Sequence, residues 1–88
     1  PAKFLTRLNP EYPRELWLQE IEGRVYVNVT VRMDGRTQDV QVHKSSGYPA
    51  MDRAAVAALQ LCVLTPAKRG GKPIEKRLRV PIDFKIRR

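Results

Sequence analysis

Residues 24–44 read RVYVNVTVRMDGRTQDVQVHK. Every second residue from Val25 to Val31 is valine, which is the pattern of a strand that is buried on one face. Asp34-Gly35 follows, and Asp-Gly between two alternating runs is a strong hairpin signal. The second run, from about Gln38 to Lys44, offers two further valines to the same face. This stretch decides the fold, because it predicts an antiparallel hairpin on which the rest of the chain can pack.

A third strand is predicted from Leu78 to Ile86, where apolar residues alternate with charged residues and Pro81. Proline has no N–H to give to a ladder, so we expect this strand at an edge of the sheet. If Pro81 directs its backbone groups outward, then Arg79, Asp83 and Lys85 do so too, because the direction alternates along a strand. Those outward groups would be free to pair with a guest strand.

A short helix is predicted before the hairpin. Pro13 can begin it, since the N–H that proline lacks would have no partner at a helix start. The helix would run to about Glu20, and Gly23 is expected to end it. Trp17 on this helix is expected to be a partly buried anchor.

A longer helix is predicted after the hairpin, from Pro49 until Pro66 stops it. Residues 67–76 contain basic side chains and two glycines, and we expect a mobile basic loop there. Apolar residues of the helix recur at three- and four-residue spacing, which predicts a stripe that lies on the sheet: Met51, Ala55, Leu59 and Cys62.

These elements predict one α+β domain over residues 1–88, with residues 1–8 as a lead-in and 9–88 as the folded core. A right-handed crossover brings the last strand beside the first, so the sheet order is second, first, third. We expect a three-stranded antiparallel sheet with two helices packed on one face, in the order helix-strand-strand-helix-strand. The lead-in is expected to hold a short N-terminal strand.

The net charge of +8 is concentrated near the C-terminal end. Residues 1–67 carry eight basic and seven acidic side chains, a net charge of +1, whereas residues 68–88 carry nine and two, a net charge of +7. Such a surface attracts nucleic acid, anionic lipid headgroups or acidic proteins, and charge alone does not select among them.

No arrangement of residues indicates catalysis. Cys62, the single cysteine, stands in an apolar run and is expected to be a buried apolar side chain. His43, the single histidine, has no second ligand or nucleophile at a suitable spacing. The run at 70–72 lacks the spacing and the Ser or Thr of a phosphate-binding loop. We therefore expect no enzyme activity, no cofactor and no metal.

Eight short motifs, in order along the chain, resemble the TonB C-terminal domain family. They are Asn-Pro-Glu-Tyr-Pro at 9–13, Ile-Glu-Gly-Arg-Val at 21–25, Asp-Gly-Arg at 34–36, Asp-Val-Gln-Val at 39–42, Ser-Ser-Gly-Tyr-Pro at 45–49, Thr-Pro-Ala at 65–67, Gly-Lys-Pro at 71–73 and Val-Pro-Ile-Asp-Phe at 80–84. The likeness covers roughly residues 9–86. It departs at Cys62, where many members have an aromatic residue, so the packing at the end of the second helix is expected to differ.

The resemblance implies the periplasmic domain of an energy transducer that is anchored in the inner membrane. Such a transducer couples the ExbB and ExbD motor to active uptake, for example of iron or siderophores, by outer-membrane transporters. The domain would bind the transporter's TonB box, a short peptide segment, and its plug region. We expect the chain to be a domain excised from that longer protein.

The resemblance also implies which residues contact the guest. The TonB box is added as a strand to the last strand of the sheet, near the Pro-x-Tyr-Pro elbow. Carried over to this sequence, partner binding falls to Asn9, Pro10, Tyr12, Pro13, Arg79, Val80, Pro81, Ile82, Asp83, Phe84, Lys85 and Ile86.

Two other interpretations stay open. A TolA-like or haem-uptake transducer domain would share the fold and the edge but bind a different partner. An RNA-binding module of the RRM type would suit the net charge of +8, but it stacks bases on aromatic residues of its central strands, and the exposed face of the first strand offers only Tyr26. We therefore expect no nucleic acid as partner. The sequence does not decide whether the domain forms a homodimer by exchanging strands.

Overall fold

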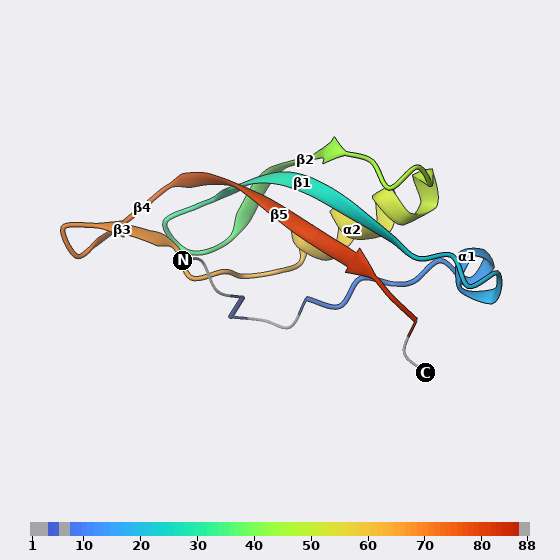
Figure 1. The fold of residues 1–88 in the computed structure, drawn as a ribbon. Coiled ribbons are helices and arrows are strands. Elements are labelled where there is room, and N and C mark those ends of the chain that lie inside the picture. Colours follow the sequence, from blue (N-terminus) through green and yellow to red (C-terminus); the bar gives the residue numbers. More distant parts are fainter. Residues whose placement is uncertain (1–3, 6–7, 87–88) are drawn as a thin grey trace.

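The computed structural model describes residues 4–5 and 8–86 and has an α+β fold (Figure 1). β2, β1 and β5 form a three-stranded antiparallel sheet in that order, as predicted. α2 lies across one face of the sheet, and α1 lies at one end of the molecule (Figure 1). The elements are α1 (Arg14–Leu18), β1 (Gly23–Val31), β2 (Thr37–Lys44), α2 (Pro49–Gln60), β3 (Ala67–Arg69), β4 (Lys72–Ile74) and β5 (Lys76–Phe84). The predicted α+β class and the three-stranded antiparallel sheet are confirmed, whereas α2 alone covers the face of the sheet that both helices were predicted to share.

The core lies between β1, β5 and α2. The four valines of β1, the middle strand, are at most 1% exposed. Val25 and Val27 pack in one cluster with residues of α2, and Val31 packs in a second cluster with Cys62 and Leu64, which follow α2. Met51, Ala55 and Leu59 of α2 are fully buried against the sheet, as predicted. Cys62, the fourth predicted member of the stripe, is also buried, but it lies beyond the end of α2 and belongs to the second cluster. Burial of each large apolar side chain stabilises the fold by roughly 1.5–3 kcal/mol. Val42 of β2 is an exception to the predicted face, since it is 40% exposed at the other edge.

α1 is shorter than predicted, and the expected roles of Gly23 as its end and of Trp17 as a partly buried anchor are wrong. Glu20 adopts a left-handed φ of 57°, so the chain turns there, and Gly23 begins β1 instead of ending the helix. A Cβ on Gly23 would lie 2.8 Å from the sulfur of Met51, so glycine at this position permits α2 to approach the sheet. Trp17 is 52% exposed, because α1 lies beyond the sheet and buries none of its residues fully.

α2 ends at Gln60, before the predicted stop at Pro66, because the β1–β2 turn binds the chain that follows it. The Thr37 hydroxyl donates to the Leu59 carbonyl over 2.8 Å, and the Leu64 N–H donates to the Gly35 carbonyl over 2.9 Å. Gly35 has a φ of +87°, and a Cβ there would lie 2.3 Å from the Leu64 oxygen. Glycine at this turn therefore permits the close approach.

A mobile loop was predicted for residues 67–76, and this prediction is wrong. The segment contains a second, two-stranded sheet. β3 and β4 pair antiparallel, with Arg69 directly opposite Lys72. Gly70 and Gly71 join them, and both have positive φ, at 57° and 79°, which a two-residue hairpin turn of type I′ requires. The hairpin projects at the end of the molecule opposite α1 (Figure 1), and the molecule measures 48 × 24 × 17 Å.

Candidate functional site

β5 is an edge strand with one regular neighbour. Its residues pair with β1 at nine consecutive positions without a register shift, from Gly23↔Phe84 to Val31↔Lys76. Among residues 4–5 and 8–86, no strand pairs with its other side. The prediction that Pro81 belongs to an edge strand is confirmed, and Pro81 lies opposite Tyr26.

The backbone N–H and C=O groups of successive residues in β5 point alternately toward β1 and toward the open side. Pro81 has no N–H, and Ile86, just past the strand, donates its N–H over 2.8 Å to the Glu22 carboxylate on the β1 side. Alternation then directs the N–H groups of even-numbered residues toward β1. The backbone groups of Arg79, Pro81, Asp83 and Lys85 consequently face outward, with the carbonyl alone at Pro81.

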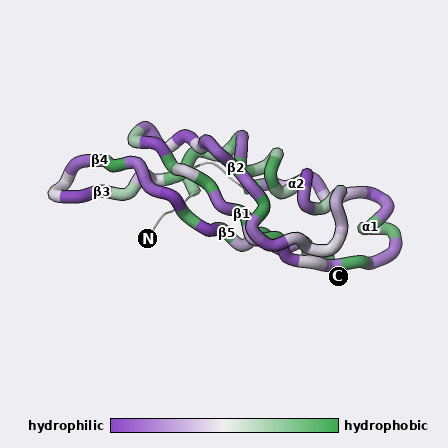
Figure 2. Tube along the Cα trace, turned by 90° about the horizontal axis from the view of Figure 1, so that it is seen from above, coloured by the Kyte–Doolittle hydropathy of each residue, from purple (hydrophilic) through white to green (hydrophobic). Residues whose placement is uncertain are grey.

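The side chains of β5 follow the same alternation. Ile82 and Phe84 are 1% and 2% exposed in the core, and Val80 is half-buried beside them. Arg79 and Asp83 point to the exposed face, and green and purple alternate along β5 in Figure 2. Lys85 is exposed and Ile86 is half-buried beyond the strand end. A guest on this edge would thus meet backbone groups without disturbing the core.

Arg24 of β1 holds the C-terminal half of β5 from the exposed face. Its guanidinium forms a two-pronged salt bridge with the carboxylate of Asp83, through Nε to Oδ1 and Nη2 to Oδ2, the second over 3.2 Å. The hydrogen bond from Arg24 lowers the pKa of the Asp83 carboxyl below its usual range, and the same bond raises the pKa of Arg24. This pair was not predicted, although Arg24 and Asp83 belong to two strands that were predicted to lie side by side.

The elbow meets β5 through Tyr12. The Tyr12 ring packs edge-on against Phe84, with ring centroids 5.4 Å apart and planes at 87°. Its hydroxyl donates to the carbonyl of Ile21, just before β1. Burial, and then the nearby Glu22 carboxylate, raise the pKa of the Tyr12 hydroxyl, so it stays a donor. Tyr12 therefore ties the predicted elbow to the end of β5.

The rest of the elbow faces α2 across a groove of about 430 Å³. Asn9, Tyr12 and Pro13 line one wall, and alanines of α2 line the other. Pro10 is half-buried. Leu61, at the far end of the groove, is 85% exposed. No site was predicted on this face of α2.

The opposite edge of the sheet is irregular. β2 pairs with β1 through two register shifts, and Asp39 within it has a left-handed φ of 51°. His43 is exposed on this strand. In the part of the chain that the structure describes, no group of three or more His, Cys, Asp or Glu side chains could hold a metal, and no helix is long and apolar enough to cross a membrane.

A family model described as the Gram-negative bacterial TonB protein C-terminal matches residues 8–86. The chain belongs to this family. A relative from Pseudomonas aeruginosa, protein TonB2, is 42% identical over 85 residues that make up 97% of this chain and 32% of the relative. The Vibrio cholerae protein TonB is 31% identical over 98% of this chain and 35% of its own length. The chain thus spans about a third of the length of these two TonB relatives.

Solved TonB structures share the fold. The solution structure of the Pseudomonas aeruginosa TonB C-terminal domain superposes with a TM-score of 0.78 at 35% identity, over 99% of this chain and 88% of that one. A TonB2 structure from Vibrio anguillarum gives 0.73 at 29% identity, over 96% and 80% of the two chains.

Proposed function

We propose that this TonB C-terminal domain binds the TonB box of outer-membrane transporters by adding it as a strand to the outer edge of β5. The observation that carries the proposal is the regular, unpaired edge of β5, with outward backbone groups at Arg79, Asp83 and Lys85. An extended peptide gains affinity from main-chain hydrogen bonds along such an edge. Family membership supports the choice of guest.

The strength of such binding suits a reversible coupler. Each backbone hydrogen bond contributes roughly 0.5–1.5 kcal/mol net, and ordering the peptide opposes this gain. Four or five bonds, aided by apolar contacts, correspond to roughly micromolar affinity. A transducer that must grip and release its partner needs binding of this order.

The elbow contributes the second contact. Tyr12 lies against Phe84 at the C-terminal end of β5, so a guest strand that continues past this end reaches Tyr12 and then Pro10, Pro13 and Asn9. In this proposal the transporter's plug region meets the elbow while the TonB box lies on β5. The wider assignment is a periplasmic domain of an inner-membrane-anchored transducer, driven by ExbB and ExbD, that supports active uptake of substrates such as siderophores.

Amide chemical-shift mapping with a panel of transporter N-terminal peptides tests the proposal. A TonB-box peptide should shift and protect the amides of Arg79, Asp83 and Lys85, and shift Tyr12, while the amides of β2 stay unchanged. A scrambled peptide of the same composition is the control. Shifts confined to β2 would contradict the proposal, and binding only by peptides from other envelope systems would favour a TolA-like or haem-uptake domain.

A further inference from the structure

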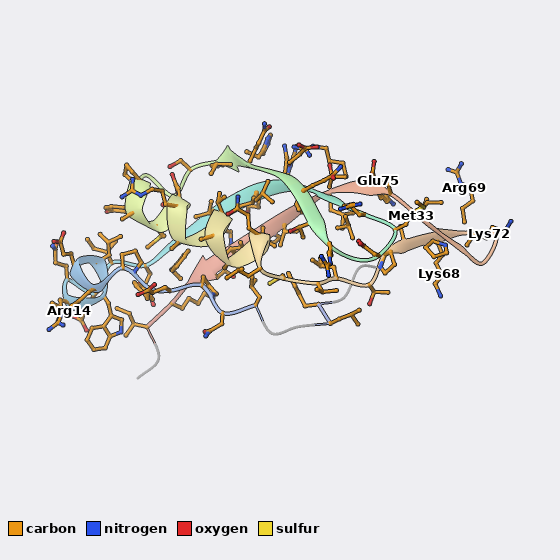
Figure 3. The ribbon with its side chains drawn as sticks, turned by 180° about the vertical axis from the view of Figure 1, so that it is seen from behind. Arg14, Met33, Lys68, Arg69, Lys72 and Glu75 are labelled. Carbon is orange, nitrogen blue, oxygen red and sulfur yellow. The ribbon has the colours of Figure 1, made fainter. Side chains whose placement is uncertain are left out.

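The β3–β4 hairpin carries cations that the sheet and its edge do not use. Lys68, Arg69 and Lys72, which we call the basic tip, are all exposed. Across residues 4–5 and 8–86, no hydrogen bond or ion pair engages these three side chains. Figure 3 shows them at one end of the molecule, with Arg14 at the other end. The basic tip is therefore available to a partner.

The pairing within the hairpin is unfavourable by itself. Arg69 lies directly opposite Lys72, and like charges at directly opposed positions of an antiparallel pair are destabilising. Strand alternation places both side chains on one face of the ribbon, with Lys68 on the other. An anionic group beside Arg69 and Lys72 would offset their repulsion, so this arrangement favours a negatively charged partner.

The shape of the tip favours a surface over a pocket-forming partner. A Cβ built on Gly70 or Gly71 would meet no atom within 4 Å, so the turn stands free in solvent. Arg69 and Lys72 lie beside the free turn, whereas Lys68, on the other face of the ribbon, borders a concavity of about 480 Å³ together with Lys76 and Leu78. A specific protein interface needs a closely packed, complementary centre, and a thin ribbon that ends in a solvent-exposed turn does not offer one. A layer of lipid headgroups adapts to a protruding cationic ribbon without such complementarity.

One apolar side chain lies at the same end. Met33, in the β1–β2 turn, is 63% exposed, and Figure 3 shows it between the basic tip and Glu75. A flexible apolar side chain beside lysine and arginine is the combination that inserts at the boundary between headgroups and acyl chains. We propose that the basic tip docks on the anionic headgroups of a phospholipid membrane, independently of the peptide edge on β5.

Vesicle co-sedimentation tests this proposal. The whole chain should sediment with vesicles that contain phosphatidylglycerol and remain in solution with phosphatidylcholine alone. Each cation near an anionic surface contributes about fivefold in partition, so the variant Lys68→Gln/Arg69→Gln/Lys72→Gln should partition on the order of 100-fold more weakly. Added salt should weaken wild-type sedimentation, because it screens exposed charge.

A matched variant separates the tip from net charge. Arg14→Gln/Lys44→Gln/Arg53→Gln removes the same charge from exposed residues of α1, β2 and α2, and should retain most of the partition. TonB-box affinity should be unchanged in the tip variant, so failure here and failure at β5 are distinguishable. An equal loss in both triple variants would overturn the proposal. So would retention on immobilised polyglutamate with no binding to vesicles, which would indicate an acidic protein as partner.

Discussion

β2 and β5 are the two edges of one sheet, and they differ in regularity. β5 matches β1 at nine consecutive positions, whereas β2 matches it through two register shifts and a left-handed residue at Asp39. Bulges and twists are devices that keep an edge from pairing with another chain. A straight edge remains a template. A small sheet can thus direct a guest strand to one of its two edges, and Pro81 removes only one donor from the open edge of β5.

Each edge is also fastened by one carboxylate. Asp83 on β5 binds Arg24, and Asp52 on α2 binds the chain that leaves β2. There the Ser46 N–H and hydroxyl donate to Asp52 Oδ1 over 2.9 and 2.8 Å, and the Ser45 hydroxyl donates to Oδ2. Burial raises the pKa of Asp52, but these hydrogen bonds outweigh it and the pKa is lowered.

The two edge strands should differ most in how much stability the domain loses when a charged side chain replaces an apolar one. Ile82→Asp places a carboxylate at a site on β5 that is 1% exposed, so we expect loss of at least about 3 kcal/mol and an unfolded domain. The same change at Val42 on β2, which is 40% exposed, should leave a cooperative melt. Thermal denaturation followed by circular dichroism checks both variants, and equal melting temperatures would show that the two edges do not differ in burial as described.

The regular parts of the sheet could be predicted from sequence because period-two alternation marks both strands and Pro81 marks the edge. The hairpin of β3 and β4 was missed although Gly70-Gly71 is itself a hairpin signal, since its strands are too short to alternate. The groove beside α2 and the turn at Gly35 depend on contacts between distant segments, and no local pattern reports those. The register shifts of β2 likewise leave no pattern in the sequence that would predict them.

The next largest effect concerns the fastening beside β2. Asp52→Asn should destabilise the domain by about 1 kcal/mol, because the neutral amide accepts more weakly from Ser45 and Ser46 at the start of α2. Ser45→Ala should cost less, since Ser46 still donates twice. Urea denaturation measures both, and an unchanged midpoint in Asp52→Asn would show that the cluster does not hold the end of β2.

Acid should loosen both fastenings. The folded pKa values of Asp52 and Asp83 are lowered, so their stabilisation is present above the unfolded value of about 3.8 and is lost as pH falls through the folded pKa values. The double variant Asp52→Asn/Asp83→Asn should therefore show a flatter decline of stability in that range. Parallel declines in the variant and the wild type, measured by urea denaturation, would contradict the role of these two carboxylates.

The smallest effects belong to exposed side chains. Arg24→Gln should lower the melting temperature slightly, because the Arg24–Asp83 pair is exposed to solvent and screened. His43→Ala on β2 should leave both folding and peptide binding nearly intact. Calorimetry and peptide titration test both. A large loss of peptide affinity in His43→Ala would move the guest to β2.

The most direct test compares proline on the two open sides. Asp83→Pro removes an outward donor from β5 and also the salt bridge to Arg24, whereas Asp83→Ala removes only the salt bridge. Val42→Pro makes the matching change on β2. Val27, the partner of Val42, directs its backbone groups toward β5, so the N–H of Val42 points outward, away from β1.

Titration of a TonB-box peptide into the three folded variants tests whether the peptide is added as a strand to β5. Relative to Asp83→Ala, Asp83→Pro should bind roughly twofold to tenfold more weakly, which is one backbone hydrogen bond of about 0.5–1.5 kcal/mol, and Val42→Pro should bind like the wild type. Unchanged affinity in folded Asp83→Pro, or a loss confined to Val42→Pro, would contradict strand addition on β5.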